Sequence, residues 1–153
     1  DIIEAAISSY NIDQILKIYS KAVVLNRLIS KEIGKDIISS YKRASNILSS
    51  ELQDKSIELN NSTEPDLFKN EYEKNLYTKI NEIRKYFTNV NKDENYEKSL
   101  KILASAKKEI FDFFDNVIVN DNDEFIKKNR LELLQMLCKS FNNYIDFSSI
   151  EGL

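Results

Sequence analysis

The scarcity of chain-breaking residues constrains the fold most strongly. The 153 residues include only two glycines, Gly34 and Gly152, and one proline, Pro65. A β-sandwich or barrel needs many tight turns, and Gly supplies the positive φ angles that such turns require. The chain is 42% hydrophobic, which at this length is enough to bury a core. We therefore predict an all-α fold, a single helical bundle of about six helices forming one domain over residues 1–153.

Apolar residues recur every three or four positions along six segments, which is the spacing of one face of a helix. The expected helices span about 2–9, 12–30, 35–52, a segment from near Pro65 to 88, 95–115 and 123–146. The inward stripe expected in the second helix comprises Ile15, Ile18, Ala22, Leu25 and Ile29.

Local signals set the expected boundaries of these helices. Asn11 is a plausible N-cap of the second helix, and Gly34 is expected to break the chain before the third. Pro65 suits an early helical position, and Asp121 or Asp123 suits the cap of the last helix.

The residues that most enzymes use for chemistry are missing. The chain has no histidine, and its single cysteine, Cys138, lies on an apolar helix face. This excludes the Ser-His-Asp and Cys-His nucleophilic sites and a CxxC metal site, and no glycine-rich phosphate loop is present. The acidic run at 121–124 lacks the Gly of a calcium-binding loop. We expect no catalytic residue, no metal and no cofactor in this segment, with Cys138 as a buried structural thiol.

Several features bound the setting of the chain. A single cysteine allows no intrachain disulfide, so a reducing, cytoplasmic compartment is expected. No window approaches 18 uncharged apolar residues, so we expect a soluble chain without a membrane span. The sequence begins at Asp1 without an initiator Met, and we expect it to be a C-terminal segment of a longer protein.

The charge distribution is uneven. The net charge of −3 is unlike that of a free-standing nucleic-acid binder, which is usually basic. Residues 17–43, however, contain seven basic and two acidic side chains, so this region has a local charge of +5. Such asymmetry allows one basic face on an acidic domain.

Three segments, taken in order, resemble a known family. They read YKRASNIL at 41–48, FFDNVIV at 113–119 and NRLELL at 129–134, and the ending YIDFS at 144–148 fits as well. Together they resemble the C-terminal anticodon-binding domain of bacterial glycyl-tRNA synthetase β subunits, which is similar to the DALR domains of arginyl-tRNA synthetases. The family often has Met after the two valines of the second segment, where this chain has Ile118 and Asn120.

The resemblance implies a tRNA-binding module of a class II ligase that pairs α and β subunits and joins glycine to its tRNA with ATP. The α subunit is expected to hold the aminoacylation site, while this segment binds the anticodon stem-loop. Unstacked anticodon bases can be held on aromatic or guanidinium planes, and their phosphates attract Lys and Arg.

Six side chains are the candidate RNA contacts. Lys42 and Arg43 are expected to meet phosphates and Asn46 a base or ribose, although Lys42 could equally be a solvated side chain and Asn46 could pin a loop. Lys127 and Lys128 lie near the start of the last helix, where a bound phosphate or simple solvation would suit them.

Arg130 and the phenylalanine pair each have a structural alternative. Arg130, the sixth candidate, lies among apolar positions, so a structural ion pair, with Asp115 as the first candidate partner, is favoured over RNA contact. Of Phe113 and Phe114, at least one is expected in the core, and a stacking role is the lesser alternative.

Two other functions remain open at this stage. One is the same domain type from an arginyl-tRNA synthetase, although the FFDNVIV and NRL segments favour the glycyl enzyme. The other is a helical scaffold that binds a protein through an apolar groove. A basic face from the second and third helices to the last would favour RNA, and an apolar groove with a neutral rim would favour protein.

Overall fold

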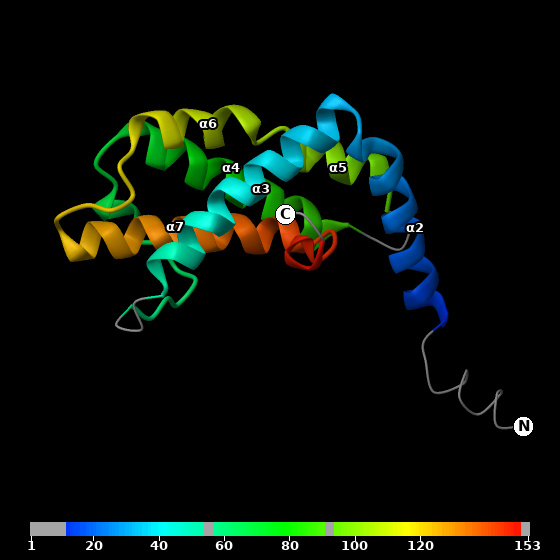
Figure 1. Ribbon diagram of the computed structural model, residues 1–153, viewed down its shortest axis with the longest axis horizontal. Helices are drawn as coiled ribbons and strands as arrows, with labels where there is room; N and C mark the ends of the chain where they lie inside the picture. The colour runs from blue at the N-terminus through cyan, green and yellow to red at the C-terminus, as the bar shows by residue number, and fades with distance from the viewer. Residues whose placement is uncertain (1–11, 54–56, 91–93, 151–153) are drawn as a thin grey trace, which may run out of the picture.

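A computed structural model describes residues 12–53, 57–90 and 94–150, and these residues contain helices and no strand (Figure 1). The α-helices are α2 (Ile12–Ile29), α3 (Glu32–Glu51), α4 (Glu71–Asn89), α5 (Tyr96–Ala104), α6 (Lys107–Asn116) and α7 (Glu124–Asn142). Two 3-10 helices, η1 (Pro65–Leu67) and η2 (Phe147–Ser149), complete them. The predicted all-α fold is confirmed, whereas the expected helix 2–9 and its neighbour Asn11 lie outside the described residues.

The core forms where α3 and α7 pack together in the middle of the bundle. α3 crosses in front of α7 in Figure 1 and also packs against α2, α5 and α6, while α4 packs against α6 and α7. α7 is the most buried helix, because apolar side chains lie on most sides of it; the buried ones include Leu131, Leu133, Leu134, Met136, Leu137 and Phe141. The surface of α3 that faces away from these neighbours stays exposed to solvent.

Gly34 lies inside α3 and packs against the end of α2, so the predicted chain break at this residue is wrong. The chain turns at Ser30 and Lys31, and Gly34 is already the third residue of α3. A Cβ atom at this position would lie 2.3 Å from the carbonyl oxygen of Leu28. The glycine is therefore required by the close approach of the two backbones.

The predicted helix 95–115 is two helices, α5 and α6, which meet at Ser105 and Ala106. The Ser105 hydroxyl donates to the carbonyl of Ile102, the acceptor that the amide of Ala106 would use in a continuous helix. That amide bonds instead to the carbonyl of Leu103. The local hydrogen bond of one serine thus accounts for the interruption.

The start of α4 also differs from the prediction. Pro65 opens the 3-10 helix η1, and the α-helix begins only after Asn70. The Asn70 side chain accepts from the amide of Glu73, and the Glu73 carboxylate accepts from the amide of Asn70 at 3.1 Å. This reciprocal capping box is encoded as Asn-x-x-Glu and outweighs the proline signal. The other predicted cap, Asp123 of α7, is confirmed.

The predicted apolar stripe of α2 is only partly inward. Leu25 is buried and Ile29 is half-buried, but Ile15, Ile18 and Ala22 are exposed. Periodicity predicts that a helix has an apolar face, but not what covers that face. In this chain the described neighbours cover only the C-terminal half of α2, which packs against α3 and α5.

Candidate nucleic-acid interface

The exposed side of α3 carries a group of basic side chains that a ligand could reach. Lys42, Arg43 and Asn46 lie on one side of the helix, as their spacing predicted, and all three are exposed. Two further side chains, Ser39 and Lys35, lie about one and two turns before Lys42 at exposed positions. Between Ile37 and Ser50 the helix has no acidic residue. We call the exposed residues Lys35, Ser39, Lys42, Arg43, Asn46 and Ser49 the α3 face.

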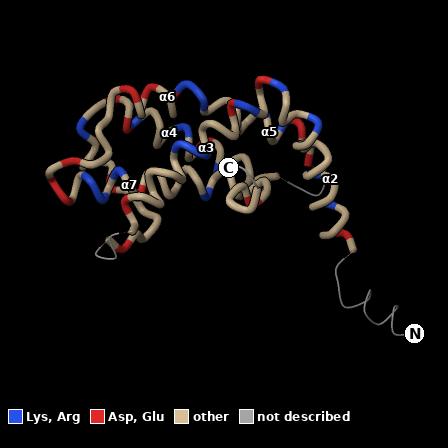
Figure 2. The backbone as a smooth tube through the Cα atoms, viewed as in Figure 1, with Lys and Arg blue, Asp and Glu red and all other residues tan. Residues whose placement is uncertain are grey.

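Two of the three acidic residues of α3 pair with lysines of other helices, and the third, Glu32, lies exposed in the first turn of the helix. Asp36 pairs with Lys107 of α6 at 2.8 Å, and Glu51 pairs with Lys127 of α7 at 2.9 Å. The hydrogen bond to Asp36 raises the pKa of Lys107. Blue segments follow α3 in Figure 2, whereas red and blue lie side by side where the turn leads into α7. The positive potential is therefore concentrated on α3 rather than at the start of α7.

Arg43 is held in place by two residues at the end of α6. Its guanidinium stacks on the ring of Phe114, with the Cζ atom 4.6 Å from the ring centroid. It also lies 3.6 Å from the carboxylate of Asp115. The side chain is nevertheless 42% exposed, so its outer edge remains accessible. Stacking of this kind fixes the planar group at little entropic cost when a phosphate binds.

Phe113 and Phe114 divide the two expected roles between them. Phe113 is fully buried, which confirms that one member of the pair belongs to the core. Phe114 is half-buried and supports Arg43. Val117 and Val119 are buried beyond them, while Ile118 between them is 77% exposed. The FFDNVIV segment therefore packs the end of α6 into the core, and its Phe114 ring supports the Arg43 side chain of α3.

Arg130 makes a structural ion pair, but the predicted partner Asp115 is wrong. Its guanidinium donates to Glu73 at 2.7 Å, to Asp121 at 2.6 Å and to the carbonyl of Ile118 at 2.8 Å. These contacts join α7 to the start of α4 and to the turn before α7. Asp115 lies elsewhere because it ends α6 beside Arg43.

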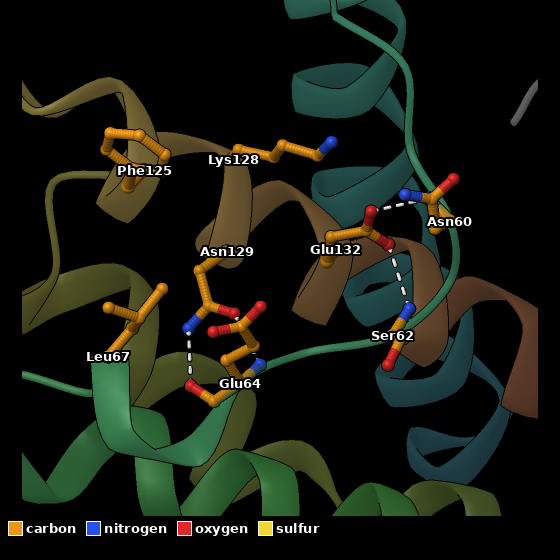
Figure 3. Close-up of a pocket in the computed structure, with 8 residues that line it drawn as sticks. All are labelled: Asn60, Ser62, Glu64, Leu67, Phe125, Lys128, Asn129 and Glu132. Atoms are coloured by element: carbon orange, nitrogen blue, oxygen red, sulfur yellow. Dashed lines mark hydrogen bonds between the residues drawn. The ribbon is translucent and has the colours of Figure 1, made fainter.

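The neighbouring Asn129 and Glu132 hold the loop that follows α3. Glu132 accepts from the amides of Asn60 at 2.5 Å and Ser62 at 3.0 Å, and Asn129 bonds both backbone groups of Glu64, as Figure 3 shows. Both side chains are buried. The polar residues of the NRLELL segment at 129–134 therefore stabilise the fold. The sequence pattern marked this segment as a family motif but did not predict these contacts of Asn129 and Glu132.

Lys127 and Lys128 diverge in the structure. Lys127 turns toward α3 to meet Glu51, with 15% of its side chain exposed. Lys128 lines a cavity of about 440 Å³, together with Phe125 and the loop at 60–64 (Figure 3). Glu64 and Glu124 lie close to Lys128, and the Asp123 carboxylate already accepts from the free amides of the first helical turn. Because of these carboxylates and the capped amides, the surroundings of Lys128 are less favourable for a phosphate than the α3 face.

The single thiol of the chain is buried. Burial raises the pKa of the Cys138 thiol to about 12, as expected for a structural thiol. Among residues 12–53, 57–90 and 94–150, no three His, Cys, Asp or Glu side chains gather in a way that could hold a metal ion. Within the same ranges no helix is long and apolar enough to cross a membrane.

Comparison with known families decides the classification of this fold. The sequence pattern of the DALR anticodon binding domain matches residues 37–151, which include α3 from Ile37 onward and every later helix. The chain belongs to the DALR anticodon-binding domain family. In this DALR domain the α3 face lies almost entirely within the matched segment, and α2 precedes it.

Three relatives carry the name glycine–tRNA ligase beta subunit. The relative from Rickettsia prowazekii is 35% identical over 127 residues, which are 83% of this chain and 18% of the relative. For Rickettsia bellii the identity is 37% over 130 residues, 85% of this chain and 18% of the relative. For Rickettsia canadensis it is 30% over 145 residues, 95% of this chain and 21% of the relative. The chain spans about a fifth of the length of these relatives.

The DALR domain also contains an exposed basic residue, Lys35, that was not among the predicted RNA contacts. Lys35 lies on the α3 face because it is seven residues, about two helical turns, before Lys42. Both residues fall within the predicted helix 35–52, so the i, i+7 spacing was visible in the sequence, but Lys35 was not singled out as an RNA contact. The structure places Lys35 and Lys42 on one side of α3.

Proposed function

We propose that this DALR domain binds the anticodon stem-loop of tRNA(Gly) within a glycine–tRNA ligase beta subunit. In the proposal it positions the tRNA in the cytoplasm for ATP-dependent aminoacylation elsewhere in the enzyme. Its partners are then the tRNA, the rest of the beta subunit and the alpha subunit. The family match and the names of the relatives support the proposal and favour the glycine over the arginine ligase.

The α3 face is the observation that carries the proposal. It combines three cations with amide and hydroxyl groups on one rigid helix, and no acidic side chain interrupts it between Ile37 and Ser50. RNA loops require phosphate neutralisation first, and amide groups such as that of Asn46 can then bind base edges. The domain as a whole has a charge of −3, so RNA would be attracted to this face rather than uniformly.

Within this face, Arg43 is the proposed principal anchor. Phe114 and Asp115 restrict its side chain before RNA arrives, so binding a phosphate orders few additional rotamers. Lys42 and Asn46 lie within one turn of Arg43 and complete the proposed contact. Arg130 and Lys127 are assigned to the fold in this proposal because protein carboxylates engage both.

The test is binding of the chain to a stem-loop with the glycine anticodon and to one with an altered anticodon. Arg43→Ala should weaken binding at least about tenfold, since a hydrogen bond to a charged group contributes roughly 1.5–3 kcal/mol. It should also reduce the slope of log affinity against log salt by about 0.7 if one phosphate contact is lost. Lys74→Ala, which removes one exposed charge on α4, is the matched control.

Each result has a distinct meaning. Preference for the glycine anticodon that depends on Arg43 supports the proposal in full. Equal and salt-sensitive binding of both stem-loops would limit the domain to positioning RNA and would place anticodon specificity elsewhere. Absence of binding at low salt, or equal effects of Arg43→Ala and Lys74→Ala, would contradict an RNA contact on the α3 face.

A further inference from the structure

The N-terminal half of α2 exposes an apolar stripe to solvent. Its members occupy positions i, i+3, i+4, i+7 and i+11, which places them on one side of the helix. Their exposed fractions run from 48% for Val23 to 68% for Tyr19. We call this set the α2 stripe: Ile12, Ile15, Leu16, Tyr19 and Val23. In Figure 1 this half of α2 projects beyond the other helices.

Solvent exposure alone does not explain these side chains. The exposed side of α3 carries Lys, Ser, Arg and Asn, as a solvated helix face should, whereas the exposed side of α2 carries Ile, Leu, Tyr and Val. Single apolar residues on a surface are ordinary, but a contiguous set marks an interaction site. The two helices therefore present different surfaces, one suited to a charged ligand and the other to an apolar partner.

The apolar surface of α2 continues around the helix into a groove. A cavity of about 490 Å³ lies between α2 and residues 144–146, where Ile18, Tyr144 and Ile145 line it. The Tyr144 hydroxyl donates to the carbonyl of Lys21, and the Lys21 ammonium lies 3.3 Å from Glu94. The C-terminal half of α2 is thus fixed to the domain and holds the stripe at a defined angle.

The exposed half of α2 has few tertiary contacts to stabilise it. Residues 12–19 are all exposed, so few tertiary contacts support the first two turns. Isolated helices of this length are marginal in water, and the β-branched Ile12, Ile15 and Ile18 have lower helix propensity than Leu or Ala. Packing against the stripe would supply the missing stabilisation.

We infer that the α2 stripe docks against another part of the same, longer polypeptide. The inference rests on the proposed function, in which this chain is one domain of a beta subunit. The Rickettsia canadensis relative aligns over 145 of the 153 residues, so at most eight are unmatched and α2 lies within the alignment. That alignment uses 21% of the relative, so most of its chain remains to cover such a face.

The size of the stripe favours an attached partner over a separate one. A stable complex of two free proteins buries about 800 Å² on each side and involves roughly 20–30 residues per partner. The stripe has five residues and seven line the groove, which together is well below that size. A segment of the same polypeptide is present at high effective concentration, so a smaller contact is sufficient.

Cysteine accessibility in the complete polypeptide tests the inference. Leu16→Cys places a thiol on the α2 stripe, and Ser49→Cys places the control on the exposed side of α3. Maleimide labelling of the native protein, followed peptide by peptide by mass spectrometry, should modify Leu16→Cys at least tenfold more slowly than Ser49→Cys. Denaturation should equalise the two rates. Equal rates in the native protein would overturn the inference.

A photo-crosslinker at Tyr19 identifies the occupant. The complete polypeptide would carry benzoylphenylalanine in place of Tyr19, prepared as a mixture of light and heavy isotope forms. Cross-links within one chain to peptides outside these 153 residues are the expected result. Light-to-heavy cross-links would identify a second copy, and cross-links to residues 1–11 would identify the adjoining segment. Either of these outcomes would overturn the inference.

Both measurements are made without RNA, so they separate the two proposals. Protection of Leu16→Cys in a protein that fails to bind the stem-loop would leave the docking surface standing and remove the RNA function. Rapid labelling of Leu16→Cys in a protein that binds the stem-loop normally would do the reverse.

Discussion

The guanidinium of Arg130 donates to the carboxylate of Glu73 at 2.7 Å, and the two side chains are 6% and 0% exposed. Glu73 also accepts from the amides of Lys69 and Asn70, so one carboxylate both caps α4 and pairs with α7. A residue in the middle of one helix thereby fixes where another helix begins.

Arg130→Met should be strongly destabilising, because it leaves the Glu73 carboxylate buried without its cation. Breaking a buried pair in this way costs about 3–5 kcal/mol. Urea denaturation followed by circular dichroism measures the change. Lys128→Met is the control on the same helix and should change the free energy of unfolding by less than about 0.5 kcal/mol. Equal effects of the two substitutions would contradict the structural role of Arg130.

Glu132→Ala should loosen the loop that follows α3 more than it affects the helices. The substitution removes the acceptor of the Asn60 and Ser62 amides, and a hydrogen bond to a charged group contributes roughly 1.5–3 kcal/mol. Hydrogen exchange should accelerate at these two amides. Lys139→Ala, at an exposed position on α7, should leave their exchange unchanged. Unaltered exchange in Glu132→Ala would refute the contact.

Gly34→Ala should destabilise the domain although Ala is the better helix former. The added Cβ would lie 2.3 Å from the Leu28 carbonyl oxygen and 2.5 Å from the Ile29 Cα, and neither backbone atom can rotate away. Overpacking of this kind costs roughly 1–3 kcal/mol. Ser49→Ala, on the exposed side of α3, should be neutral or slightly stabilising in the same thermal melts.

Asp115→Asn should strengthen stem-loop binding if Arg43 contacts a phosphate. The carboxylate lies 3.6 Å from the Arg43 guanidinium and is 64% exposed, so it competes with the phosphate for the same cation. Removing one charge at about 4 Å in water changes the energy by about 1 kcal/mol, or roughly fivefold in affinity at low salt. The gain should vanish in the Arg43→Ala background, and an unchanged affinity of Asp115→Asn would argue against the contact.

Asp121 should make the stability of the domain depend on pH. Hydrogen bonds lower the pKa of Asp121 below its ordinary value; the bond from the Asp123 amide has the largest effect, and the bond from Arg130 comes next. A carboxyl with a lower pKa in the folded state stabilises that state above its unfolded pKa of about 3.9, and this stabilisation is lost as the pH falls through the folded pKa. The destabilisation by Asp121→Asn should therefore be larger at pH 7 than at pH 2.5 in urea denaturation, and a difference independent of pH would contradict the assignment.

Sequence patterns predicted the helices well and their junctions less well. Long apolar periodicities located α3, α4 and α7 to within a few residues, apart from the late start of α4. The junctions depended on single polar contacts, such as the Ser105 hydroxyl and the Asn70–Glu73 capping box. The capping box was visible as Asn-x-x-Glu, whereas the Ser105 hydrogen bond competes with the backbone by an amount that residue spacing does not reveal.

Among the candidate RNA residues, local spacing predicted the placement of some, whereas tertiary contacts decided the partners of others. Lys42, Arg43 and Asn46 lie within about 100° of arc on α3 because of the 3.6-residue helical turn, and the structure exposes that side. Their contact with RNA stays a prediction. Arg130 was expected to pair, yet its partners come from α4 and from the turn before α7, 57 and 9 residues away.

The sequence by itself determined the all-α class, the absence of histidine chemistry and the basic character of α3, because composition and periodicity depend only on neighbours along the chain. Only the tertiary structure decided that Glu73 and Asp121, rather than Asp115, pair with Arg130, and that α2 leaves an apolar stripe uncovered. Such outcomes depend on which helix surfaces meet. That choice is made by the burial of the whole core at once, so no local pattern contains it.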